Sequence, residues 1–210
     1  MSHFTRRQII RAGATIGAVA LGQCTFCESS FAAQGDTNDE VNRIARALMP
    51  PVRRGGEADH TAEQQPRLKN VRLKRDGLNL QERDELYEAT RSLPQIALEI
   101  NFAFDSADLR PDAIPHLNAL GQALSVTNLQ ANHIVIGGHT DRKGTAEYNL
   151  ELSERRAASV LHFLVERFSF DRKNFTTVGY GFEKLKNTAD PFAAENRRVE
   201  VVNGGVVISK

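Results

Sequence analysis

Alternating apolar residues mark the start of a predicted sheet in the second half of the chain. Every second residue is apolar from Ile96 through Leu98, Ile100 and Phe102 to Phe104, which is typical of a strand with one buried face. Polar turn residues follow, and Pro111 suits the first turn of a helix. Four apolar residues then recur at helical spacing: Ile114, Leu117, Leu120 and Leu124. The pattern predicts a strand followed by an amphipathic helix.

The remaining pattern predicts three more strands and a long helix. Residues 133–136 form a second strand that enters Gly137 and Gly138, residues 175–180 form a third, and residues 197–202 form a fourth. The helix between the second and third strands has an apolar stripe, and Ser153 is a candidate N-cap that could interrupt it. The stripe consists of Leu150, Ala157, Leu161, Leu164 and Phe168. We therefore expect an α/β (α+β) domain over residues 95–203, with helices on a mixed sheet in the order β-α-β-α-β-β, and a short tail over residues 204–210.

The first 32 residues have the pattern of an export signal. Arg6, Arg7 and Arg11 make the start positive, residues 12–22 are uncharged, and Ala32 ends a small-x-small cleavage site. The two adjacent arginines resemble the twin-arginine export motif, and an ordinary Sec signal is the alternative. The uncharged run is too short for a bilayer span. A signal peptide over residues 1–32 places the mature protein outside the cytoplasm.

Cys24 offers a second way of processing the N-terminus. The residues before it look like a lipoprotein site in which Cys24 becomes the lipidated first residue, although Gln23 stands where that site has a small residue. Lipidation would anchor the protein to a membrane. Cleavage after Ala32 would instead leave a mature protein without cysteine, since Cys27 is the only other one.

Residues 33–94 are predicted to be a linker with two short helices. One has apolar residues at helical spacing from Val41 to Met49 and stops at Pro50, and the other covers residues 80–92 and ends at Pro94. The polar stretch between them includes five cations within residues 67–75, which suit a solvated linker or a contact with anionic head groups or wall phosphates. Either helix could pack on the following domain, or residues 36–93 could bind an envelope partner.

Charge and composition exclude several classes of function. Lysine and arginine number 27 against 26 acidic residues, so the formal net charge of +1 lacks the basic excess of a nucleic-acid-binding protein. No apolar run is long enough to span a membrane. Two cysteines provide neither a disulfide framework nor an ordinary zinc cluster. The sequence predicts no cofactor and no bound metal.

Three motifs follow the predicted strands in order. A loop runs from Gly138 to Gly144, a helix carries a Tyr-Asn-x-x-Leu-Ser-x-x-Arg-Ala pattern from Tyr148, and the last strand starts with Asn196-Arg197-Arg198-Val199-Glu200. With the Phe-x-Phe-Asp strand that ends at Asp105, they resemble the OmpA-like C-terminal domain, a peptidoglycan-binding module of porin-like proteins, Pal-type lipoproteins and flagellar stator subunits. The resemblance covers about residues 95–203 and departs from the family pattern at Phe182, where an acidic residue is common.

The resemblance implies a ligand and a set of residues that bind it. Its ligand is the diaminopimelate of the peptidoglycan stem, whose free end carries an ammonium and a carboxylate on one carbon. The resemblance assigns Asp141 to the ammonium and Arg156 to the carboxylate, which a guanidinium can hold through two parallel hydrogen bonds. Asn149 adds a contact or holds the loop, Arg198 binds or supports the site, and the backbone around Asp105 forms the opposite wall.

Several of these residues also have structural interpretations. Asp141 could merely cap the following helix. His139, Thr140 and Gly144 are expected to support the loop rather than to catalyse. Arg155 and Arg197 point away from their neighbours Arg156 and Arg198 and are interpreted as surface residues.

The function predicted from these residues is non-catalytic peptidoglycan binding in the periplasm or at the outer membrane of a Gram-negative cell. One alternative is a periplasmic adaptor that keeps the fold and binds protein instead of the wall. A metal-dependent enzyme using His133, His139 and Asp141 is a further alternative, but no catalytic motif accompanies them. The retained pair of Asp141 and Arg156 favours wall binding.

Overall fold

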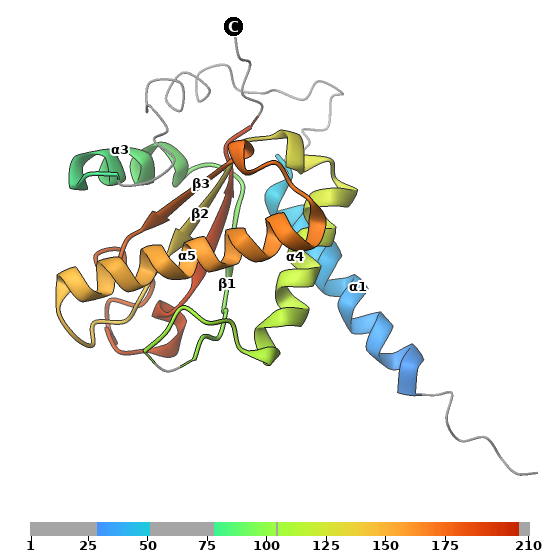
Figure 1. The fold of residues 1–210 in the computed structure, drawn as a ribbon, viewed down its shortest axis with the longest axis horizontal. Coiled ribbons are helices and arrows are strands. Elements are labelled where there is room, and N and C mark those ends of the chain that lie inside the picture. The colour runs from blue at the N-terminus through green and yellow to red at the C-terminus, as the bar shows by residue number, and fades with distance from the viewer. Residues whose placement is uncertain (1–28, 51–77, 104, 206–210) are drawn as a thin grey trace, which may run out of the picture.

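The structure is a computed structural model that describes residues 29–50, 78–103 and 105–205. Four strands form one mixed sheet in the order β1-β4-β2-β3, where β1 is Gln95–Leu98, β2 is Ile134–Gly138, β3 is Phe175–Gly179 and β4 is Val199–Asn203. Strand β4 lies antiparallel between β1 and β2, whereas β2 and β3 are parallel and joined by a helix (Figure 1). The predicted α+β class and element order are confirmed.

Helices cover one face of the sheet. The 3-10 turn Pro111–Ala113 leads into α4 (Ile114–Val126), and α5 (Ala146–Phe168) runs diagonally across the strands (Figure 1). Their apolar stripes pack with Ile134, Ile136 and Val201 in the main core. The spacing of these apolar residues along the chain thus reflects a single buried layer.

Helix α5 is continuous through Ser153, so the predicted interruption there is wrong. The side chain of Thr145 caps the helix by accepting the backbone N–H of Tyr148 at 3.2 Å. Ser153 is completely buried, and its hydroxyl donates to the carbonyl of Leu150 while accepting the N–H of Gly181. The serine therefore serves a tertiary contact instead of a helix start.

The first strand is shorter than the alternation predicted. Strand β1 ends at Leu98, and Phe102 then forms an isolated antiparallel bridge with Leu109. Phe104 lies outside the described residues. The alternation still tracks burial, because Ile96, Leu98 and Ile100 all face the core.

Both helices predicted within residues 33–94 pack on the domain. Helix α1 (Ser29–Leu48) lies along α4, where Ile44 and Leu48 are completely buried, and its earlier turns extend beyond α4 (Figure 1). The predicted cleavage point after Ala32 lies inside this helix.

Helix α3 (Leu80–Thr90) covers the opposite face of the sheet. It starts with a capping box between Asn79 and Glu82, and its Leu86 packs on Val135 and Val202. Within the described part of the chain, no helix is long and apolar enough to cross a membrane.

Candidate functional site

Three segments converge at one end of the sheet to hold the loop between β2 and α5. The N–H of His139 donates to the carbonyl of Arg198 at 3.0 Å, that of Thr140 to Gly181 at 2.9 Å, and that of Arg142 to Pro191 at 3.1 Å. The loop backbone is thereby attached to the segments that follow β3 and precede β4. Its position relative to both strands is fixed by hydrogen bonds as well as by chain connectivity.

Two glycines give the loop its path. A Cβ atom on Gly138 would lie 2.1 Å from the backbone oxygen of Ser153, so only glycine lets β2 approach α5 this closely. Gly144 has a φ of +98°, a conformation that other residues rarely adopt. Its predicted supporting role in the loop has this conformational basis.

Asp141 lies in this loop and does not cap α5, since Thr145 does. One carboxylate oxygen, Oδ1, accepts the N–H of Lys143 at 3.0 Å. The other, Oδ2, accepts Nη1 of Arg197 at 2.8 Å in an ion pair. The side chain of Asp141 is only 16% exposed. Its carboxylate is therefore held in place from both sides.

Arg156 projects from α5 toward the loop that follows β1. Its Nε donates to the carbonyl of Ser106 at 3.1 Å, and its guanidinium lies over the ring of Phe102, 4.8 Å from the centroid. Burial lowers the pKa of Arg156, and the charge of Arg197 adds to this, whereas the charges of Asp141 and Asp105 oppose it. The charges of Asp105 and Asp141 thus favour the charged form of Arg156.

The outer edge of the Arg156 guanidinium is available for a ligand. Among the described residues, neither Nη1 nor Nη2 of Arg156 has a hydrogen-bond partner, and no ion pair joins it to Asp141. Asp105, in the left-handed conformation at φ 52°, is exposed on the turn beside it. Arg155 points elsewhere as predicted and lies 3.7 Å from Glu151 on the exposed side of α5.

Asn149 holds the loop. Its side chain is almost fully buried, and Nδ2 donates to the carbonyls of Lys143 at 2.8 Å and Thr145 at 2.9 Å. Of the two roles that the resemblance implied for Asn149, the geometry shows the second. The two bonds fix the end of the loop against the first turn of α5.

Arg198 lies away from Asp141 and Arg156. Its Nη2 donates to the carbonyl of Lys184 at 3.2 Å and lies 3.9 Å from Oε2 of Glu200, on the sheet face that α3 covers. Burial lowers the pKa of Arg198, although the charge of Glu200 opposes this. Among the described residues, the hydrogen bond and ion pair of Arg198 therefore go to Lys184 and Glu200 rather than to Asp141 or Arg156.

Arg197 is the residue that the sequence analysis missed. Arg197, which was interpreted above as a surface residue, forms the ion pair with Asp141. Arg197 ends the 3-10 turn Ala194–Asn196 with φ −83° and ψ 84°, so it lies before β4 and outside the extended strand. Alternation along the predicted strand therefore could not show which way its side chain points.

His139 supports the loop from within the fold. His139 is 2% exposed, its Nε2 lies 3.1 Å from Oε2 of Glu200, and its ring stacks on Tyr180 with centroids 5.1 Å apart. Burial lowers the pKa of His139, and the nearby charge of Arg198 adds to this, while Glu200 opposes it. Thr140 is also buried and contributes its backbone N–H to the loop. Cys24 lies outside the described residues.

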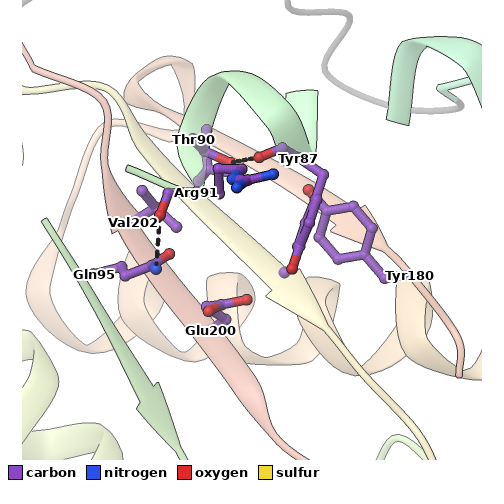
Figure 2. Close-up of a pocket in the computed structure, with 9 residues that line it drawn as sticks. Tyr87, Thr90, Arg91, Gln95, Tyr180, Glu200 and Val202 are labelled. Carbon is purple, nitrogen blue, oxygen red and sulfur yellow. Dashed lines mark hydrogen bonds between the residues drawn. The ribbon is translucent and has the colours of Figure 1, made fainter. Parts of the chain in front are cut away.

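A separate hollow lies on the opposite sheet face, beside α3 (Figure 2). Its lining includes Tyr87, Arg91, Gln95, Tyr180 and Glu200, and none of Asp141, Arg156 and Arg197. Among the described residues, no cluster of three or more histidine, cysteine or acidic side chains could hold a metal ion.

The fold and the site define an α/β domain with two carboxylates and two guanidiniums near one end of its sheet, those of Asp105, Asp141, Arg156 and Arg197. Residues 101–198 match the OmpA family.

Two curated relatives share this part of the chain. The peptidoglycan-associated lipoprotein of Pseudomonas putida is 37% identical over 102 residues, which cover 48% of this chain and 59% of that protein. Outer membrane protein A of Bordetella avium is 39% identical over 104 residues, covering 48% of this chain and 51% of the relative. The chain therefore spans only a little over half the length of these relatives.

One solved structure that this chain matches is that of the peptidoglycan-associated lipoprotein of Burkholderia pseudomallei. It is 32% identical, with a TM-score of 0.41, and the match covers 49% of this chain and 86% of that one.

Proposed function

We propose that this chain is a non-catalytic, peptidoglycan-binding protein of the cell envelope that holds the wall through the diaminopimelate of the stem peptide. The OmpA family domain and relatives named peptidoglycan-associated lipoprotein support the wall as ligand. The position of Asp141 and Arg156 supports diaminopimelate, because a carboxylate and a guanidinium from separate segments lie within electrostatic reach without a hydrogen bond between them.

In this proposal a zwitterion occupies the space between the two side chains. The ammonium of diaminopimelate binds the carboxylate of Asp141, whose oxygens keep lone pairs beyond those used by Lys143 and Arg197. The carboxylate of diaminopimelate accepts two parallel hydrogen bonds from the outer nitrogens of Arg156. Phe102 and the carbonyl of Ser106 orient the guanidinium before the ligand arrives.

Arg197 adds a second cation to this site. Its ion pair with Asp141 orients the carboxylate, and its side chain is 47% exposed, so it remains within reach of a ligand. With Arg156 it gives the site two positive charges, which suits the several carboxylates of a stem peptide. Asp105 opposes Arg156 across the turn and keeps the site from being uniformly positive.

The matched ligand for a test is wall whose stem contains lysine in place of diaminopimelate. Lysine has the same ammonium but lacks the carboxylate next to it, so it removes the group that Arg156 is proposed to bind. We expect purified diaminopimelate-type sacculi to retain the protein and lysine-type sacculi to release it. Equal retention by both walls would overturn diaminopimelate as the ligand, and failure of the wild type to bind either wall would overturn wall binding.

Variants of the same chain locate the site. Asp141→Ala and Arg156→Ala should each abolish retention on diaminopimelate-type sacculi, whereas Arg155→Ala should retain it because Arg155 faces away. Unchanged retention of the double variant Asp141→Ala plus Arg156→Ala would place the wall-binding surface elsewhere. The adaptor alternative instead predicts that the wild type binds neither wall.

Attachment at the N-terminal side belongs to the same proposal. Export by a signal within residues 1–32, lipidation of Cys24 and an envelope partner for residues 36–93 remain predictions. Mass spectrometry of the mature N-terminus distinguishes a chain that begins after Ala32 from one that begins at a lipidated Cys24.

A further inference from the structure

Helix α3 lies outside the matched family region, yet it contacts α5 and the segment that follows β3. Its Arg83 forms an ion pair of 3.2 Å with Glu154 on α5, and the Arg83 side chain is only 12% exposed. Its Asp84 forms an ion pair of 3.0 Å with Lys184, in the segment that follows β3. Glu154 is two residues before Arg156. The helix is thus attached on one side to the element that carries the proposed carboxylate-binding arginine.

A row of three rings connects α3 to the loop that carries Asp141. Tyr87 of α3 meets Tyr180 edge to face, with centroids 5.5 Å apart and planes at 73°, and the two rings lie together in Figure 2. Tyr180 in turn stacks on His139 at 5.1 Å. The ammonium of Lys184 lies 4.9 Å from the centre of the Tyr87 ring, which fixes that ring further.

The row ends on the backbone of the loop. Tyr180 donates its N–H to the carbonyl of Gly138 at 3.0 Å, and the next residue, Gly181, accepts the N–H of Thr140 at 2.9 Å. His139 lies two residues before Asp141, and Glu200 holds its other side at 3.1 Å. A shift of the Tyr180 ring therefore moves the backbone that places the Asp141 carboxylate.

We propose that α3 is part of the wall-binding site and that Tyr87 is a positioning residue, which acts through Tyr180 and His139 on Asp141. This inference rests on the proposed function for its ligand, although the loop geometry can be measured without one. Tyr87 sets the loop side of the gap between Asp141 and Arg156, while Arg83 fixes α3 to the side of α5. A partner that displaces α3 would then weaken wall binding without touching the ligand.

The surroundings of Tyr87 allow its ring to be removed with little risk to the fold. The side chain is half-buried and borders the hollow of Figure 2, together with Thr90, Gln95 and Glu200. Truncation to alanine enlarges a space that is already open to solvent, so it leaves no closed cavity in the core. Leu86, which is completely buried one residue earlier, continues to anchor the helix.

The test compares three variants of the full chain for binding to a soluble muropeptide with a diaminopimelate stem. Tyr87→Ala should weaken the affinity about two- to twelvefold, the equivalent of one lost aromatic pair. Tyr87→Phe keeps the ring and should bind as the wild type does. Glu88→Ala changes an exposed residue on the same turn of α3 and should also leave the affinity unchanged.

Hydrogen exchange separates positioning from general stability. In Tyr87→Ala, the amide of Thr140 should exchange faster, while that of Val135 in the middle of the sheet should keep its rate. A uniform increase across the domain, or an unchanged affinity for Tyr87→Ala, would overturn the positioning role. If the wild type fails to bind the muropeptide, the proposed function is wrong. The exchange rate of the Thr140 amide then still decides whether Tyr87 positions the loop.

Discussion

Replacing Arg156 by lysine tests the proposed zwitterion site because it keeps the charge and removes the shape. In the structure, Nε of Arg156 donates to the carbonyl of Ser106 and the planar guanidinium lies over Phe102, which leaves both outer nitrogens for a carboxylate. A lysine ammonium is a point charge that cannot bond Ser106 and offer two parallel donors at the same time.

The expected loss follows from the number of hydrogen bonds. A guanidinium that holds a carboxylate by two charge-assisted bonds becomes an ammonium that makes one. A hydrogen bond to a charged group contributes about 1.5–3 kcal/mol. Each 1.4 kcal/mol is about a factor of ten in affinity. Arg156→Lys should therefore bind diaminopimelate stem peptides about ten- to a hundredfold more weakly than the wild type.

Calorimetry with a soluble diaminopimelate muropeptide measures this loss, and Arg155→Lys is the matched control. Arg155 has the same chemistry on the same turn of α5 but points toward Glu151, so its exchange for lysine should leave the affinity unchanged. Thermal unfolding of both variants checks that the fold persists. An affinity of Arg156→Lys within about twofold of the wild type would refute the bidentate arrangement, and with it the reasoning that links Phe102 and Ser106 to ligand binding.

Two further predictions concern stability. Burial lowers the pKa of His139 from its ordinary value of 6.5, so the unfolded chain takes up a proton before the folded chain does. The free energy of unfolding should consequently fall as the pH drops below about 6.5, by up to about 1.4 kcal/mol per pH unit. Urea titrations at several pH values should show this slope in the wild type and a smaller slope in His139→Gln. Equal slopes in the wild type and the variant would contradict the buried neutral imidazole. Asn203→Ala should lower the free energy of unfolding by about 1–3 kcal/mol, because Nδ2 of Asn203 donates to the buried carbonyl of Leu48 at 2.9 Å. Asn132→Ala removes only a bond to the Asn203 side chain and is the control, and an equal loss in both would argue against the Leu48 contact.

Local periodicity predicted the strands and helices of the domain because each has one buried side. The prediction was wrong where a residue is covered by other elements but is not paired within the sheet. Phe102 continues the apolar alternation of β1, but its ring supports the guanidinium of Arg156 instead of a neighbouring strand. An alternating pattern reports which side of the chain is covered, and it carries no information about which element covers it.

Ser153 shows a local signal that a tertiary contact overrides. Serine is favoured at helix starts, and the pattern after it suited a new helix. In the structure its hydroxyl accepts the N–H of Gly181, two segments away, and Gly138 approaches its backbone. A single sequence does not contain that contact.

The residues of the candidate site that belong to a sequence motif could be predicted. Those whose position depends on tertiary packing could not. Asp141 and Arg156 came from the family resemblance, and the structure brings them within electrostatic reach. Arg197 lies in the turn before β4, where strand alternation does not show which way a side chain points. The contribution of α3 was beyond the sequence, since the spacing of its apolar residues did not say whether it packs on this domain or on a partner.

The folded unit extends beyond the family match at both ends. Residues 101–198 omit α1, β1 and all of β4. Yet Ile44 and Leu48 of α1 are completely buried in the core, and truncation of such residues costs about 2–5 kcal/mol each, a large part of the stability of a domain. The end of α1 is bonded to Asn203 at one end of β4, and Arg197 precedes the other end of β4 beside Asp141. Helix α1 packs along α4 and is also bonded to β4, so α1 and the proposed ligand site belong to one folded unit.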